Sequence, residues 1–331
     1  MRLAKMGSRA LLRLALLFAC MEDVKAESLA RELKLRSEKE GLGIAKFSGN
    51  SIITVIDLDG TGRRRELVVP GLDYVYDIEP RSQVILASNK GLLNALRKDG
   101  LAAVMTGSFA LFSLDGHETR PTGLLTWPRL AALSPKLDSL AVLSLAEAAG
   151  QACLLYGPLD WSSTRKVFCL DLGNIDLVNY REENFSWSPD QNFLVYSMEG
   201  RIYIFEISSR TTRSVAEGSD PCWSPDGRAI AYRSKNRDLM LYMVSTGRTD
   251  QLTKLYAVVG FPRWSPDSEY LLFTQSNLLL ALRDLHTLPT TEFMVIRVSD
   301  GAVAPVYTPG MDMDNRRFYW VRTGVRRGPV R

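Results

Sequence analysis

The chain has 331 residues, of which 46% are hydrophobic, 24% charged and 9% aromatic. This composition is typical of a globular protein and excludes a disordered chain, a coiled coil and a disulfide-dense miniprotein. The formal net charge is +4, and the first 26 residues hold more basic than acidic side chains. The remainder is therefore nearly neutral, which argues against a bulk nucleic-acid binder.

The first 26 residues have the pattern of a secretory signal peptide. Basic residues up to Arg13 precede a short apolar run over 14–21, and Val24 and Ala26 occupy the −3 and −1 positions of a cleavage site. The run is too short to span a bilayer. One alternative is a basic amphipathic helix that stays on the protein. Another is a lipid anchor, because the segment LFAC resembles a lipoprotein box with Cys20 as the acylated residue.

Residues 27–42 predict a short helical or linker segment that is too small for a further domain. Cleavage after Ala26 would leave three cysteines, Cys153, Cys169 and Cys222, so at least one is unpaired within a monomer. Cys153 and Cys169 lie in two strand-like runs. A cross-strand bridge and buried free thiols both remain open for them.

Three later segments share Trp-Ser-Pro-Asp followed by an alternating apolar run, with the prolines 36 and 41 residues apart. Fainter copies contain Pro80 and Pro135, and 312–323 is a candidate sixth copy. Such self-similarity is typical of a repeat protein of the WD40-like kind. The shared residues are Trp187, Pro189, Asp190, Trp223, Pro225, Asp226, Trp264, Pro266 and Asp267.

Apolar strands that end in a tight turn alternate with these segments. Each unit therefore predicts four antiparallel strands, A to D, in which the Ser-Pro-Asp turn joins A to B and the second turn joins C to D. The second turns end at Gly60, Gly116, Gly173, Arg210, Gly247 and Gly301.

These units predict an all-β fold, a six-bladed β-propeller of four-stranded antiparallel blades over residues 43–323. One such sheet cannot bury both faces, whereas six arranged radially can. The first unit lacks the Ser-Pro-Asp turn, and the last segment has a candidate A–B portion but no strand C. We therefore expect 312–323 to pair beside the N-terminal strands and close the ring. The basic tail 324–331 is expected to be a solvated end.

The block from Trp223 to Tyr232, WSPDGRAIAY, resembles the propeller repeat of the TolB family. Related blades occur in the propeller domains of prolyl-oligopeptidase-like peptidases. The resemblance covers residues 43–323 and is sharpest over 180–309. It implies a periplasmic, protein-binding propeller, here without the N-terminal α/β domain of TolB.

Loop lengths favour one rim of the ring for binding. The A–B and C–D turns lie on one rim, here called the turn rim, and the B–C and D–A connections lie on the other, the insert rim. We interpret the repeat residues as structural, with the tryptophans packing between blades. Extra residues at 88–100, 146–165 and 276–291 are placed between strands B and C, where long loops are candidates for binding. The candidate binding residues on the insert rim are Arg97, Trp161, Glu183, Asp220, Arg263 and Arg283.

The segment IITVIDLDGT at 52–61 resembles the first motif of haloacid dehalogenase-type phosphatases. Asp57 would be the nucleophile and Asp59 the acid/base, with bound Mg²⁺. The later Asp pair and Lys that this chemistry requires do not follow, so a structural hairpin is the better interpretation. The chain also lacks a nucleophile elbow and a P-loop. We assign no catalytic residue, no metal ligand and no cofactor.

The resulting hypothesis is an exported, non-catalytic scaffold in the bacterial cell envelope, located in the periplasm or secreted. It would bind a protein or peptide on the insert rim, as a monomer without a membrane span and without nucleic acid. The alternative is a propeller enzyme, a lyase or hydrolase with its site in the central channel, or a carbohydrate-binding propeller.

Overall fold

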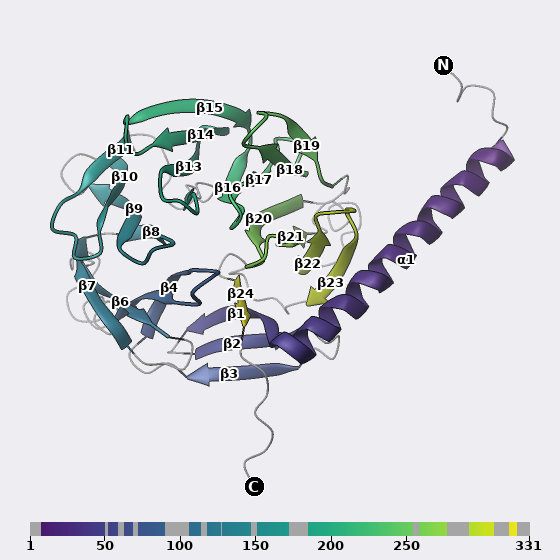
Figure 1. Cartoon of the computed structure of the whole chain (residues 1–331), viewed down its shortest axis with the longest axis horizontal. Helices are drawn as coiled ribbons and strands as arrows, with labels where there is room; N and C mark the ends of the chain where they lie inside the picture. Colours follow the sequence, from purple (N-terminus) through teal and green to yellow (C-terminus); the bar gives the residue numbers. More distant parts are fainter. Residues whose placement is uncertain are drawn as a thin grey trace, which may run out of the picture.

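The structure, a computed structural model, describes residues 8–49, 52–58, 63–68, 72–89, 106–113, 118–126, 128–146, 151–171, 185–253, 258–276, 291–307 and 318–322. These residues form one long helix and 24 strands. The strands make six four-stranded antiparallel sheets, which stand side by side around a ring (Figure 1). The predicted six-bladed β-propeller is confirmed.

In blades two to six the four strands follow one another in the chain, from the innermost strand A to the outermost strand D (Figure 1). Blade two comprises β4 (Leu72–Ile78), β5 (Ile85–Asn89), β6 (Thr106–Phe112) and β7 (Glu118–Thr126). Blade three comprises β8 (Pro128–Leu133), β9 (Ser139–Ala146), β10 (Gln151–Pro158) and β11 (Arg165–Asp171). Blade four comprises β12 (Phe185–Trp187), β13 (Phe193–Met198), β14 (Arg201–Glu206) and β15 (Thr211–Glu217). Blade five comprises β16 (Ser219–Trp223), β17 (Ala229–Arg233), β18 (Leu239–Met243) and β19 (Thr249–Gln251). Blade six comprises β20 (Val258–Trp264), β21 (Tyr270–Ser276), β22 (Thr291–Arg297) and β23 (Val303–Tyr307).

Blade one is built from both ends of the chain. Strand A is β24 (Phe318–Arg322), and strands B to D are β1 (Leu42–Gly49), β2 (Ile52–Asp57) and β3 (Arg64–Val68). β24 pairs with β1 in antiparallel register. The predicted closure by the C-terminal segment is confirmed, but that segment supplies strand A alone. Strand B comes from the N-terminal side: β1 pairs with β24 along one edge and with β2 along the other, so it lies between them in the sheet.

Blade three differs from the prediction. The run at 167–171, expected as strand C, lies in strand D, and the region 146–165 contains strand C itself. Trp161 therefore lies in a C–D turn on the turn rim. In this turn the Asp160 carboxylate accepts the N–H and hydroxyl of Ser162 at 3.0 and 2.8 Å. The runs at 151–158 and 165–171 both have the pattern of a strand, and the sequence alone did not show which is strand C and which is strand D.

The same register explains the cysteines of blade three. β10 and β11 place Cys153 directly opposite Cys169, and the two form a disulfide bond. Cys222 in β16 is a buried free thiol. Burial raises the pKa of this thiol to about 12, so it stays protonated at neutral pH.

The Ser-Pro-Asp segments form the A–B turns, as predicted. In blades four to six the serine hydroxyl donates to the aspartate two residues later at 2.6 Å. The serine oxygen accepts the first N–H of strand B. The residue directly after the aspartate has a positive φ, which is 64° at Gln191, 78° at Gly227 and 65° at Ser268. Only Gly227 adopts this left-handed conformation without steric cost.

Neighbouring blades are joined by hydrogen bonds between their A strands. Three indole N–H groups donate to a carbonyl of the preceding blade: Trp187 to Ala132 at 3.2 Å, Trp264 to Cys222 at 3.1 Å, and Trp320 to Arg263 at 2.9 Å. Apolar side chains from facing sheets fill the space between the blades.

The left-handed residues of the A–B turns add a second set of links on the turn rim. The Gln191 side chain accepts the backbone N–H of Lys136 at 2.7 Å, and the Ser268 hydroxyl accepts that of Asp226 at 3.0 Å. In each case the side chain reaches the A–B turn of the preceding blade. Each such turn therefore stabilises both its own hairpin and a junction between blades.

Helix α1 (Ser8–Glu40) precedes the ring and has 33 residues. It runs without a break from Ser8 in the predicted leader to Glu40 in the predicted short segment at 27–42, and Leu42 at the end of that segment already belongs to β1. Its amino-terminal part extends away from the ring, and its carboxyl-terminal part lies against it (Figure 1). The helix ends at Gly41, whose φ of 66° and N–H bond to the Ser37 carbonyl at 3.1 Å form a glycine cap.

Ring closure gives a testable stability difference. We expect truncation after residue 317 to abolish cooperative folding, because it removes β24 with the fully buried Phe318 and Val321 and the nearly buried Trp320. One lost core aromatic costs about 3–5 kcal/mol, against a total stability of about 5–15 kcal/mol. Truncation after residue 323 keeps β24 and is the matched control. Thermal unfolding followed by circular dichroism would compare the two, and equal melting temperatures would contradict the assignment.

Candidate binding surfaces

The carboxyl-terminal part of α1 lies across the junction of blades six and one. Leu29 and Leu33 face the ring and are 0% and 1% exposed. They belong to one apolar cluster with Tyr270 of β21 and with Ala302 and Ala304 beside and within β23. Residues four apart lie on the same face of a helix, so this stretch presents one narrow apolar stripe to the propeller.

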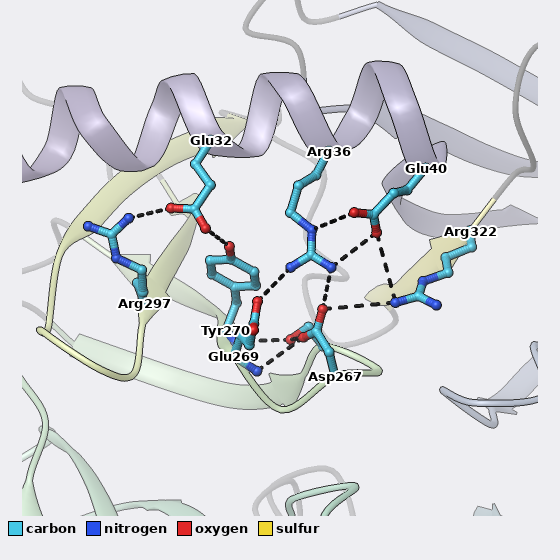
Figure 2. Close-up of polar contacts among 9 residues, drawn as sticks. Glu32, Arg36, Glu40, Asp267, Glu269, Tyr270, Arg297 and Arg322 are labelled. Atoms are coloured by element: carbon cyan, nitrogen blue, oxygen red, sulfur yellow. Dashed lines mark hydrogen bonds and ion pairs between the residues drawn. The ribbon is translucent and has the colours of Figure 1, made fainter.

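Glu32, between the two leucines, binds two side chains of blade six (Figure 2). The Tyr270 hydroxyl and the Arg297 guanidinium both donate to its carboxylate. Burial, and next the Glu32 carboxylate, raise the pKa of Tyr270 to about 12. Arg297 also donates to Asp300 at 2.8 and 3.0 Å, and its pKa is raised by Asp300 and Glu32. Glu32 therefore fixes the position of α1 along the rim.

Arg36, one helical turn further on, is the centre of a second group of charges (Figure 2). Its guanidinium donates to Asp267, to Glu269 at 2.9 Å, and within the helix to Glu40 at 3.1 and 3.2 Å. It also lies over the Tyr270 ring, 5.2 Å from the centroid. Burial alone would lower the pKa of Arg36, but its hydrogen bonds raise that pKa above the ordinary value.

These contacts place α1 where a turn of blade one would otherwise lie. Asp267 belongs to the A–B turn of blade six, the equivalent of Asp226 in blade five. The next blade contacts Asp226 through its own A–B turn. Strands A and B of blade one come from opposite ends of the chain, so no A–B turn joins them, and Arg36 of α1 contacts Asp267 instead. Residues 29–40 are called the α1 clasp below.

A second set of polar side chains lies in strand A of blades two, four and six. Each of them stands one position before the tryptophan or its equivalent. Asp77 of blade two and Ser186 of blade four each accept a backbone N–H from the next blade, from Leu133 at 2.9 Å and from Trp223 at 2.8 Å. In blade six Arg263 holds this position, and its guanidinium lies over the ring of Tyr319 in blade one, 5.9 Å from the centroid. Each of these side chains therefore contacts the next blade.

The structure places three of the predicted binding residues. Asp220 lies within strand A of blade five, not in a D–A connection, with φ of 55°. It is 1% exposed and ion-paired to Arg233 at 3.2 Å. Arg263 also lies within a strand A, and Trp161 lies on the opposite rim from the one predicted. Asp220 and Arg263 both act electrostatically on the Cys222 thiol, whereas Trp161 lies apart from them on the turn rim.

Arg97, Glu183 and Arg283 lie outside the described residues, and so do Asp59 and the basic tail. Asp57 is 5% exposed at the end of β2. The nine Trp-Ser-Pro-Asp residues lie at the A–B turns and inner strands described above. Among the described residues no group of His, Cys, Asp and Glu could hold a metal ion, and within the same ranges no helix has the length and apolarity to cross a membrane.

Sequence reasoning missed the α1 clasp and Asp77. A signal for the clasp exists: Leu29 and Leu33 are four residues apart, Glu32 and Arg36 repeat that spacing, and Gly41 follows. This is an amphipathic helix with a glycine stop. No comparable signal identifies Asp77, since its role emerges only when the blades are superposed on one another.

The site and fold define a six-bladed propeller whose N-terminal helix is docked on one rim. No family model matches the chain. Three curated proteins match parts of it: dipeptidyl-peptidase 5 of Porphyromonas gingivalis (30% identity over 117 residues, 28% of this chain and 17% of that protein), the uncharacterized peptidase YuxL of Bacillus subtilis (38% over 88 residues, 24% and 13%), and the Tol-Pal system protein TolB of Alcanivorax borkumensis (35% over 61 residues, 17% and 14%). The matched segments thus span less than a fifth of each curated relative.

Two solved structures resemble most of the chain. A putative TolB from Agrobacterium tumefaciens aligns with a TM-score of 0.53 and 17% identity, covering 81% of this chain and 88% of that one. TolB from Acinetobacter baumannii aligns with a TM-score of 0.56 and 13% identity, covering 84% and 66%. The chain therefore has a TolB-like six-bladed propeller fold.

The clasp predicts unequal effects of two leucine substitutions on one helix. We expect Leu33→Ala to lower the free energy of unfolding by about 2–4 kcal/mol, because it leaves a cavity in the closing junction. Leu35→Ala is the control, since Leu35 is 51% exposed, and its effect should stay within about 0.5 kcal/mol. Urea denaturation of both variants measures the difference, and equal midpoints would mean that α1 does not stabilise the ring.

Asp77 predicts a specific pH dependence. Burial raises the pKa of this carboxyl to about 6, partly offset by the Leu133 N–H and by Arg263. Folding therefore favours the protonated form, and stability falls as pH rises from the ordinary aspartate pKa through 6. We expect Asp77→Asn, which keeps an acceptor for Leu133, to gain about 1–3 kcal/mol over the natural chain between pH 4 and 7. Chemical denaturation at both pH values is the measurement, and parallel pH profiles would contradict it.

Proposed function

We propose that this protein is an exported, non-catalytic propeller scaffold that binds a protein or peptide in the bacterial cell envelope. The observation that carries the proposal is the likeness of the whole ring to TolB propellers, together with a partial match to a protein named for the Tol-Pal system. The peptidase relatives match over short segments.

Two features support export to the periplasm or beyond the cell. The first is the leader pattern ending at Ala26. The second is the bond between Cys153 and Cys169, because disulfides persist in oxidising compartments and are rare in the cytosol of mesophiles. Cleavage after Ala26 would also keep the α1 clasp, since within residues 21–40 the first fully buried side chain is that of Leu29.

The insert rim is the proposed binding surface. The α1 clasp contacts Asp267, Glu269 and Arg297 in and beside turns of the turn rim, so the clasp itself does not occupy the insert rim. The long connections at 90–105 and 277–290 join strands B and C of blades two and six, so both leave the ring at the insert rim. Those blades flank blade one on either side. Two inserts from the two neighbours of one blade could contact a single partner.

Export predicts a defined N-terminus and a defined thiol content. We expect protein recovered from the periplasm to begin at Glu27 and to contain one thiol under denaturing, non-reducing conditions, that of Cys222. Intact-mass spectrometry before and after alkylation measures both. A chain that begins at Cys20 with added acyl mass would favour the lipid anchor. A full-length chain confined to the cytosol would contradict export.

Binding at the insert rim predicts loss of a partner after loop trimming. Cross-linking in intact cells, followed by capture of the protein and mass spectrometry, should recover one dominant envelope protein. Shortening the inserts within 90–100 and 277–290 should reduce its recovery at least tenfold. The control is Arg228→Ala on the turn rim, whose side chain is 83% exposed and should not affect recovery. A partner retained by the trimmed chain would place the binding surface elsewhere.

A further inference from the structure

The surface of the turn rim that α1 covers, called the groove below, has the chemistry of a helix-binding site. Tyr270 and the small residues Ala302 and Ala304 provide its apolar part. At one end, the Tyr270 hydroxyl and the Arg297 guanidinium bind a carboxylate. At the other end, the carboxylates of Asp267 and Glu269 bind a guanidinium. The two charged ends are one helical turn apart, matching the spacing of Glu32 and Arg36.

These features define both the sequence and the direction of the helix that fits. A helix with leucines four residues apart, an acid just before the second leucine and an arginine four residues after the acid satisfies every group. A helix in the opposite direction would bring its acid to Asp267 and its arginine to Arg297, and like charges would meet at both ends. Charge complementarity thus supplies specificity in addition to the apolar contact.

The apolar contact of α1 with this groove is limited in extent. Within 21–40 only Leu29 and Leu33 are fully buried, and most other side chains are exposed. The helix joins the ring through Gly41, whose φ is 66°. An isolated helix as short as residues 29–40 is marginal in water, so the clasp owes its order to the groove. Elements with few buried contacts open locally at lower cost than the core.

We propose that this groove is a second protein-binding surface, which takes an amphipathic helix of a partner bearing the pattern Leu-x-x-Glu-Leu-x-x-Arg in place of the α1 clasp. It lies on the rim opposite the inserts, so it goes beyond the function proposed above. The chain's own clasp and the partner helix compete for the same groups. Weakening the clasp therefore strengthens partner binding, because the apparent dissociation constant scales inversely with the open fraction.

The probe is a fluorescein-labelled peptide of residues 27–40, titrated against the exported chain by fluorescence anisotropy. We expect saturable binding that is at least tenfold tighter for Leu33→Ala than for the natural chain. Leu35→Ala is the matched control and should bind as the natural chain does. Thermal unfolding of each variant establishes that the ring is folded at the assay temperature.

A charge reversal tests the register of the groove. In the chain Arg297→Glu, the clasp loses its partner for Glu32, and Asp300 remains beside the new carboxylate. The natural peptide should bind this chain at least tenfold more weakly than the peptide with Glu32→Arg, and the preference should invert for Leu33→Ala. Binding of both peptides alike by both chains would mean apolar adhesion and would overturn the proposal.

Two further results would also overturn it. The first is the absence of peptide binding to a folded Leu33→Ala chain. The second is dimerisation of that chain, measured by analytical ultracentrifugation and reversed by the peptide, which would make a second copy the occupant. Loss of the envelope partner on trimming the inserts is independent of all these outcomes, so failure here leaves the function of the insert rim untouched.

Discussion

Every other feature of this molecule depends on the pairing of β24 with β1. A blade of four strands has two edges and two faces, and only a closed ring buries the faces of all six sheets between neighbours. The last strand to enter the ring comes from the far end of the chain, and its backbone bonds with β1 run from Leu42 to Lys46. Trp320 then donates to the Arg263 carbonyl of the preceding blade. Trp264 and Trp187 likewise each donate to a carbonyl of the blade before their own. The closing junction therefore repeats the chemistry of the internal ones.

The junction still differs from the others, because it lacks one A–B turn. Elsewhere these turns bear the left-handed residues that reach the preceding blade, as Gln191 and Ser268 do. At the closing junction α1 contacts Asp267 in a different way: the Arg36 guanidinium donates to the Asp267 carboxylate, whereas Gln191 and Ser268 accept a backbone N–H. The clasp is thus part of the ring's bonding scheme, and its charges make the same segment a candidate for exchange with another helix.

Sequence reasoning predicted the blades well where composition and geometry coincide. Ser188, Asp190 and their counterparts are required by the turn itself, so they recur and reveal the repeat. Blade three shows the opposite case, in which two adjacent apolar runs both fit a strand and Trp161 was assigned to the wrong rim. Asp77 and Ser186 share a role because a side-chain oxygen of each accepts a backbone N–H of the next blade. Since the two residue types differ, no sequence pattern reveals this shared role. The α1 clasp was missed because Glu32 and Arg36 look like an ordinary solvated helix face, and the surface they contact lies more than 230 residues away in the chain.

The antiparallel register of the closing strands has a mechanical consequence. The first residue of β1, Leu42, pairs with Arg322 at the end of β24, so tension between the two termini peels the pair apart one bond at a time. The α1 clasp is connected in series before β1, and its seat holds Glu40 within 4.0 Å of Arg322. In a chain held at its N-terminus and pulled at its C-terminus, the force would act on the contacts of the α1 clasp before it reaches the first hydrogen bond between β1 and β24. Tethering at the N-terminus would then make α1 the element that yields first, and the blades behind it would remain intact under load.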